Sequence, residues 1–130
     1  MQEKQASTVE ELHSQLWFFF DALNNYTTVI QNRTGNEKEE KRLYVADKYD
    51  EIKLTLRNKA LYIPVNLHSE IERTCLVIHK TAIKFMKNIE REYGAEMLGE
   101  WDRIHKEVNV DIKKAIKSLE NEFRALLGAS

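Results

Sequence analysis

The chain has 130 residues, of which 42% are hydrophobic and 32% are charged, so it is long enough for one domain with a sizeable core and too short for two. Its 20 basic and 21 acidic side chains leave a net charge of −1, which excludes a global field that would favour nucleic acid or an anionic membrane. One proline and four glycines are too few for the turns of a sheet protein, so the composition favours a few long helices.

The first predicted helix begins near Ser7 and Thr8, each of which has a glutamate three residues later, as in a capping box. We expect residues 1–7 to form a flexible polar N-terminus and the helix to cover residues 8–33, stopping at Gly35. Apolar residues recur along it in a heptad rhythm, which is typical of a coiled-coil-like helix that packs along one face: Val9, Leu12, Leu16, Phe19, Leu23, Tyr26 and Ile30.

The second and third predicted helices flank Pro64, the only proline of the chain. Proline fits the first turn of a helix and disfavours helical geometry at the residue before it, here Ile63. We therefore expect helices over residues 37–60 and 64–93, with Gly94 just past the second of them. Their apolar faces are Val45, Tyr49, Ile52 and Leu56 in one, and Leu67, Ile71, Cys75, Ile78, Ala82, Phe85 and Ile89 in the other.

The fourth predicted helix covers residues 96–127 and ends at Gly128. Its start has two interpretations: Gly99 lies inside a helix that begins at Ala95, at a cost of about 1 kcal/mol relative to alanine, or it marks a loop before Glu100. The apolar face of this helix is Trp101, Ile104, Val108, Ile112, Ala115, Leu119, Phe123 and Leu126.

The four apolar faces meet when each predicted helix folds back on the one before it. One cross-section then combines large and medium apolar groups: Phe19, Ile52, Ile71 and Leu119. The sequence therefore predicts an all-α fold, a single domain over residues 1–130 that forms an antiparallel up-down-up-down four-helix bundle.

Two charged stripes support the pairing of the third and fourth helices. Folded antiparallel, a basic stripe lies beside an acidic one: Lys80, Lys84, Lys87 and Arg91 against Glu96, Glu100, Glu107 and Asp111. We expect mutually screened surface pairs. Because interleaved exposed aromatic residues and a net positive charge are both missing, the basic stripe does not predict nucleic-acid binding.

Two carboxylate-x-x-His pairs, Glu10 with His13 and Asp102 with His105, have the spacing found in di-iron bundles. Both pairs point away from the apolar faces, and antiparallel packing puts them at opposite ends of the bundle. The pattern therefore indicates surface histidines, with no metal site and no cofactor.

Cys75, the only cysteine, falls on an apolar face opposite Ala115 and is predicted to be a small buried thiol. A single cysteine forms no internal disulfide, which fits a reducing compartment. No apolar run reaches the length of about 18 residues that a membrane span needs, so we expect a cytoplasmic chain without a membrane segment. His68 and Glu72, at i and i+4, are predicted to pair on a helix surface.

Arg73 and His79 match the R-x(4–6)-H motif of HEPN ribonucleases, which are also all-α domains of about this size. This resemblance implies a metal-independent ribonuclease in which Arg73 binds and polarises the scissile phosphate and His79 acts as general base toward the 2′-hydroxyl. Thr74 stands where the family frequently has a polar amide, an acid or an imidazole. We keep this activity as the alternative hypothesis for function.

Two longer stretches, Tyr49 through Leu67 and Trp101 through Gly128, resemble a loose group of uncharacterised bacterial helical-bundle proteins. In that group an N-terminal membrane anchor and a coiled coil often precede the bundle. The resemblance implies a bacterial source and an interaction role, and either a soluble member or the cytoplasmic part of a membrane-anchored protein.

The leading hypothesis is a non-enzymatic interaction or scaffold module that meets another helical protein or forms a homodimer. It depends on apolar residues that the four helix faces leave over, since consecutive aromatic residues spread around most of the first helix and three leucines line the outside of the second. The predicted interaction surface is Trp17, Phe18, Phe20, Leu43, Leu54 and Leu61. No catalytic residue is predicted under this hypothesis.

Overall fold

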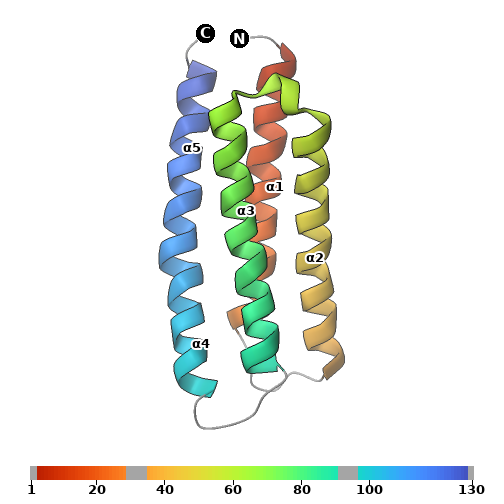
Figure 1. The fold of residues 1–130 in the computed structure, drawn as a ribbon, viewed down its shortest axis with the longest axis vertical. Coiled ribbons are helices and arrows are strands. Elements are labelled where there is room, and N and C mark those ends of the chain that lie inside the picture. Colours follow the sequence, from red (N-terminus) through yellow and green to blue (C-terminus); the bar gives the residue numbers. More distant parts are fainter. Residues whose placement is uncertain (1–2, 29–34, 91–96, 129–130) are drawn as a thin grey trace.

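The computed structural model describes residues 3–28, 35–90 and 97–128, which form an antiparallel four-helix bundle (Figure 1). We call each continuous helical arm of the bundle a rod. The first three rods are α1 (Glu3–Thr28), α2 (Gly35–Asn58) and α3 (Val65–Phe85), and the π-helical turn η2 (Met86–Glu90) continues α3. The fourth rod runs through α4 (Met97–Lys106), the π-helical turn η3 (Glu107–Ile112) and α5 (Lys113–Gly128). The predicted fold class is therefore confirmed.

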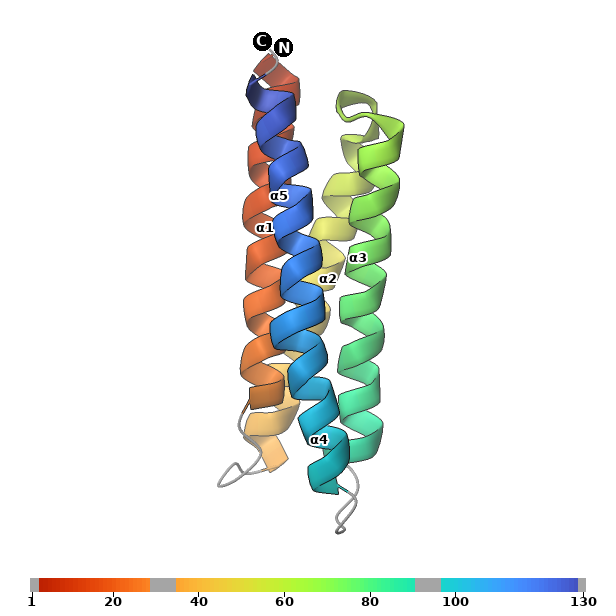
Figure 2. The same cartoon turned by 90° about the vertical axis from the view of Figure 1, so that its left-hand side faces the viewer.

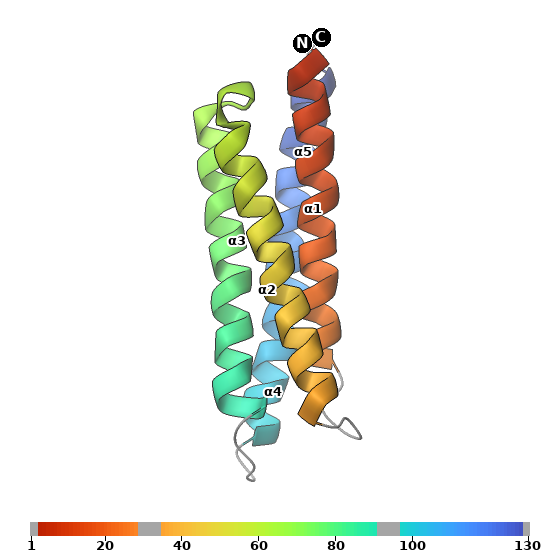
Figure 3. The same ribbon diagram turned by 90° about the vertical axis from the view of Figure 1, so that its right-hand side faces the viewer.

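The rods follow one another around the bundle in chain order, so α1 also lies beside α5 (Figure 2). Seen from the opposite side, α2 lies in front and presents its outer face to the viewer (Figure 3). The start of α1, the end of α5 and the short 3-10 helix η1 (Ala60–Tyr62) lie at one end of the bundle.

The observed helix bounds differ from the predicted ones mainly at the first helix. α1 begins at Glu3, so residues 3–7 are helical and the predicted start at Thr8 is wrong. The Thr8 hydroxyl donates backward to the Lys4 carbonyl at 2.7 Å, which is a bond inside a helix rather than a cap at its start. Gly99 lies inside α4, as the first of its two interpretations expected. The predictions for Ile30, Gly94, Arg91 and Glu96 fall outside the described residues.

The hinge between α2 and α3 has the geometry that its proline imposes. Ile63 is extended, with φ −128° and ψ 145°, as expected for a residue that precedes proline. Pro64, the predicted helix start, is the N-cap of α3, which begins one residue later at Val65, and the Pro64 carbonyl accepts from the His68 amide at 3.0 Å. The buried Ile63 side chain anchors this turn to the core.

The core follows the predicted apolar faces closely. All four residues of the predicted cross-section, Phe19, Ile52, Ile71 and Leu119, are buried. Between the third and fourth rods, Lys84 Nζ lies 3.2 Å from Glu107 Oε2, so one contact of the predicted charge stripes is present.

One position of the fourth rod differs from the prediction. Ile116 is fully buried, whereas Ala115, which we assigned to the apolar face, is only partly buried. Buried residues here recur every four positions, from Ile104 through Val108 and Ile112 to Ile116. Such spacing drifts by about 40° per step around an α-helix. The wider π turn η3 offsets this drift, and the core-facing position moves from Ala115 to Ile116.

Candidate functional site

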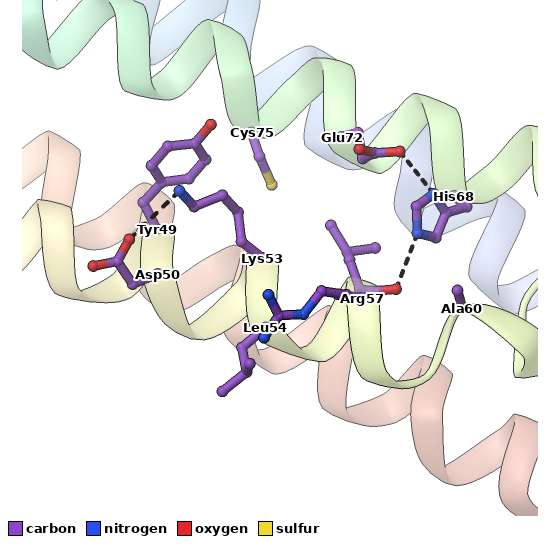
Figure 4. A pocket seen from close by; sticks show the side chains of 10 residues that line it. Tyr49, Asp50, Lys53, Leu54, Arg57, Ala60, His68, Glu72 and Cys75 are labelled. Carbon is purple, nitrogen blue, oxygen red and sulfur yellow. Dashed lines mark hydrogen bonds and ion pairs between the residues drawn. The ribbon is translucent and has the colours of Figure 1, made fainter.

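A groove of about 790 Å³ runs between α2 and α3, close to the hinge (Figure 4). Its lining is mixed, with an aromatic ring, cations, carboxylates, an imidazole and a thiol beside aliphatic groups. These residues are Tyr49, Asp50, Lys53, Leu54, Leu56, Arg57, Ala60, His68, Glu72 and Cys75.

Tyr49 forms one end of the groove and is fixed by rings on two sides. Its ring stacks on Phe19, with centroids 5.5 Å apart, and on His79 at 4.4 Å. Lys53 Nζ lies 4.2 Å from the Tyr49 ring centroid and 3.5 Å from Asp50 Oδ1. Burial and the nearby Lys53 charge lower the pKa of His79, so its imidazole is neutral at pH 7. The uncharged ring stacks on Tyr49 as an aromatic group.

His68 closes the other end of the groove. Its Nδ1 lies 2.8 Å from Glu72 Oε1, which confirms the predicted pair, and its Nε2 lies 3.0 Å from the Leu56 carbonyl oxygen (Figure 4). Leu56 belongs to the last turn of α2, where carbonyls lack partners within the helix. His68 therefore joins the end of α2 to the start of α3.

Cys75 points its sulfur into the groove, and its predicted burial is confirmed (Figure 4). Burial, with a smaller contribution from Glu72, raises the pKa of the thiol to about 12. The uncharged thiol that results is a poor nucleophile and a poor metal ligand. Of the polar groups of the groove, His68 links the two walls through the Leu56 carbonyl, whereas the Asp50–Lys53 and His68–Glu72 pairs each lie within one helix.

The structure does not bring Arg73 and His79 together. Both lie on α3, six residues apart, which separates them by about 120° around the helix and about 9 Å along it. Arg73 is exposed, whereas His79 is half-buried against Tyr49. The two side chains therefore lie in different surroundings on α3.

The carboxylate-x-x-His pairs are also separate. His13 Nε2 turns to Glu120 Oε2 on α5, at 2.7 Å, away from Glu10. His105 contacts Asn109 and the Trp101 ring. Within residues 3–28, 35–90 and 97–128, no group of three or more His, Cys, Asp or Glu side chains could hold a metal ion.

Four residues of the predicted interaction surface are exposed, and two are not. Phe18, Leu43 and Leu54 are about half exposed, and Leu61 is 97% exposed. Phe20 is buried, and Trp17 packs partly buried against it and donates from Nε1 to Glu120 Oε2 at 3.0 Å. The placement of Phe20 on a surface is therefore wrong, while Trp17 is partly covered by its contact with Glu120 of α5.

Val65, 80% exposed at the start of α3, is an apolar surface residue that the sequence reading missed. The sequence did carry a signal for its exposure, namely its spacing from Leu67 along the helix. Two residues before the core residue Leu67, it lies about 200° away around the helix and so faces outward.

The comparisons with known proteins add no identity, since no family model, curated protein or solved structure matches this chain. Among the described helices, none is long and apolar enough to cross a membrane.

Proposed function

We propose that this chain is a non-enzymatic, cytoplasmic interaction module that self-associates through an exposed helix surface. The observation that carries the proposal is the outer face of α2, where Leu43 and Leu54, followed by Leu61 in η1, are exposed on the side opposite the core. These leucines recur at helical spacing with charged residues between them, and exposed apolar groups gathered on one face, rimmed by polar residues, are typical of contact surfaces.

The interior of the bundle supports the same proposal. His13, His68 and His79 are each held by neighbouring side chains or carbonyls, and the Cys75 thiol is neutral. The groove between α2 and α3 has structural contacts at both ends. The leucines of α2 and η1 are among the large apolar side chains that packing within one copy leaves exposed in the described part of the chain, and Leu54 also lines the groove.

Light scattering over a range of concentrations tests the proposal. We expect the average mass to rise above that of one chain from the micromolar to the millimolar range. Leu54→Glu should shift the protein to the monomer, because it buries a charge in the contact. Leu76→Glu on α3, where the wild-type side chain is similarly exposed, is the matched control and should leave the mass unchanged. A monomeric mass at all concentrations would refute self-association.

Phe18→Glu asks whether the exposed aromatic side chain of α1 belongs to the same surface. We expect it to weaken association as well, with helicity by circular dichroism unchanged in both charged variants.

Incubation with mixed RNAs in EDTA separates this proposal from the ribonuclease alternative. We expect no cleavage by the wild-type chain. Cleavage that is lost in both Arg73→Ala and His79→Ala would overturn the proposal, because it would assign the motif a catalytic role despite the distance between its two residues.

A further inference from the structure

The outer face of α2 carries a second regularity beyond its leucines. Exposed residues recur at spacings of 4, 3, 4, 3 and 4, which is the rhythm of a coiled-coil seam. At about 100° per residue the five that lie in α2 stay within about 40° of one line, opposite the buried Val45 and Ile52, and Leu61 follows them in η1. We call this set the outer strip: Leu43, Asp47, Asp50, Leu54, Arg57 and Leu61.

The charges of the outer strip select one way of meeting a second copy. A parallel arrangement would put Asp47, Asp50 and Arg57 each against its own equivalent, which gives three like-charge contacts. In an antiparallel arrangement centred at the level of Ile52, Leu43 lies opposite the partner's Leu61, Asp47 opposite the partner's Arg57, and Asp50 opposite the partner's Leu54. All six positions then lie in the contact: Asp47 and Arg57 form ion pairs, and Asp50, which is paired with Lys53 of its own chain, lies against the partner's Leu54.

Neighbouring antiparallel registers are less favourable. A shift of one heptad in one direction puts Leu43 against the partner's Leu54, but it brings Asp47 against the partner's Asp50, twice by symmetry, and removes the ion pair with Arg57. A shift in the other direction leaves Leu43 outside the contact and puts Leu54 against the partner's Arg57. Only the central register combines the leucine contact with the ion pair.

The side chains that this contact needs are available. In the described part of the chain, neither Asp47 nor Arg57 has an ion pair within 4.0 Å. By contrast, Glu51 and Lys53, which flank the strip near its centre, are neutralised within their own chain at 2.9 Å by Lys48 and at 3.5 Å by Asp50. Like-charge approach of these flanking groups to their copies is thereby reduced.

We propose that two copies associate antiparallel through the outer strips of α2, with Asp47 of each chain paired to the partner's Arg57. This inference rests on the proposed self-association and specifies its surface, symmetry and register. The contact is isologous, so each ion pair and each leucine contact occurs twice around a two-fold axis. The Asp47–Arg57 pairs set the register, while the leucines supply the apolar contact.

Charge reversal tests the register. Asp47→Arg and Arg57→Asp each create two like-charge contacts, and each should weaken dimerisation by about tenfold or more at low salt. The double variant Asp47→Arg/Arg57→Asp should regain wild-type association. An equimolar mixture of the two single variants should also dimerise, because both contacts across the axis then join opposite charges. Analytical ultracentrifugation gives the equilibrium constants.

Asp102→Arg, a reversal at an exposed position of α4, is the matched control and should leave association unchanged. Circular dichroism should show that every variant keeps its helicity. If Leu54→Glu dissociates the wild-type dimer but neither the double variant nor the mixture restores it, the register is wrong and the proposed function stands. If the wild-type chain stays monomeric at every concentration, both proposals fail.

Discussion

Two contacts in the bundle, α1 with α5 and α2 with α3, are built in different ways. Between α1 and α5, Glu120 Oε2 accepts from Trp17 Nε1 at 3.0 Å and contacts His13 Nε2 at 2.7 Å, while the His13 ring meets Phe123 edge-on at 6.1 Å. Between α2 and α3, a groove of about 790 Å³ remains. The first contact is closed by aromatic and charged side chains, and the second is open.

The difference follows from the order of the chain. The short hinge from Lys59 to Pro64 joins α2 to α3 and keeps them adjacent, so the entropy cost of closing that loop is small. By contrast, α1 and α5 lie at opposite ends of the sequence, so their pairing depends on side-chain contacts. Trp101 Nε1, which donates to the Thr27 carbonyl at 2.7 Å, adds a second tie between the first and fourth rods. A groove is therefore tolerated between two helices that a short connection already holds adjacent.

The largest expected effect comes from the closed side. Ile116 is fully buried in α5, and Ile116→Ala should destabilise the fold by about 2 to 5 kcal/mol, because it removes apolar contacts and leaves a cavity. Urea unfolding followed by circular dichroism measures the loss. Val110→Ala, at an exposed position of η3, is the control and should change stability by less than about 0.5 kcal/mol. A similarly small loss for Ile116→Ala would mean that Ala115, not Ile116, faces the core.

The choice between Ala115 and Ile116 as the core-facing residue is the point at which the sequence failed to predict the fold. Heptad spacing identified most of the buried faces, because each α-helical turn returns an apolar residue to the core. The same rule selected Ala115 over Ile116, since it assumes a constant number of residues per turn. The π turn η3 breaks this assumption, and a single sequence carries no direct signal for it.

At the candidate site, contacts set by local spacing were predictable from the sequence, whereas the wider burial of α1 was not. The pairing of His68 with Glu72 and the burial of Cys75 follow from local spacing and were predicted. Phe20 was misplaced, and the partial burial of Trp17 was not foreseen, because the prediction gave α1 one narrow buried stripe. A bundle helix with neighbours on two sides buries a wider arc, and α5 covers the second side.

A smaller effect is expected at Glu120, and it depends on pH. Hydrogen bonds from His13, and then from Trp17, hold the pKa of Glu120 below its ordinary value of 4.5. The carboxylate therefore stabilises the fold above pH 4.5, and this contribution is lost as the pH falls through the lower pKa of the folded state. Glu120→Gln should cost about 1 kcal/mol at neutral pH and remove this part of the acid sensitivity.

Urea unfolding at neutral pH and at several values below pH 4.5 measures both consequences. Glu10→Gln, at an exposed position of α1, should keep the wild-type pH dependence. Equal loss of stability with acid in the wild type and in Glu120→Gln would show that the Glu120 carboxylate is not stabilised by its contacts with α1.

The smallest effect is expected in the groove. Cys75 is buried but points its sulfur toward the groove between α2 and α3, so the added apolar atoms of Cys75→Leu have the groove to extend into (Figure 4). Stability should change by less than about 0.5 kcal/mol in either direction. Ala22→Leu, which enlarges a buried position of α1, should cost about 1 to 3 kcal/mol, because no such space is present there. Urea unfolding of both variants compares the two regions directly. A loss at Cys75→Leu equal to that at Ala22→Leu would mean that the groove is closed at the level of the thiol.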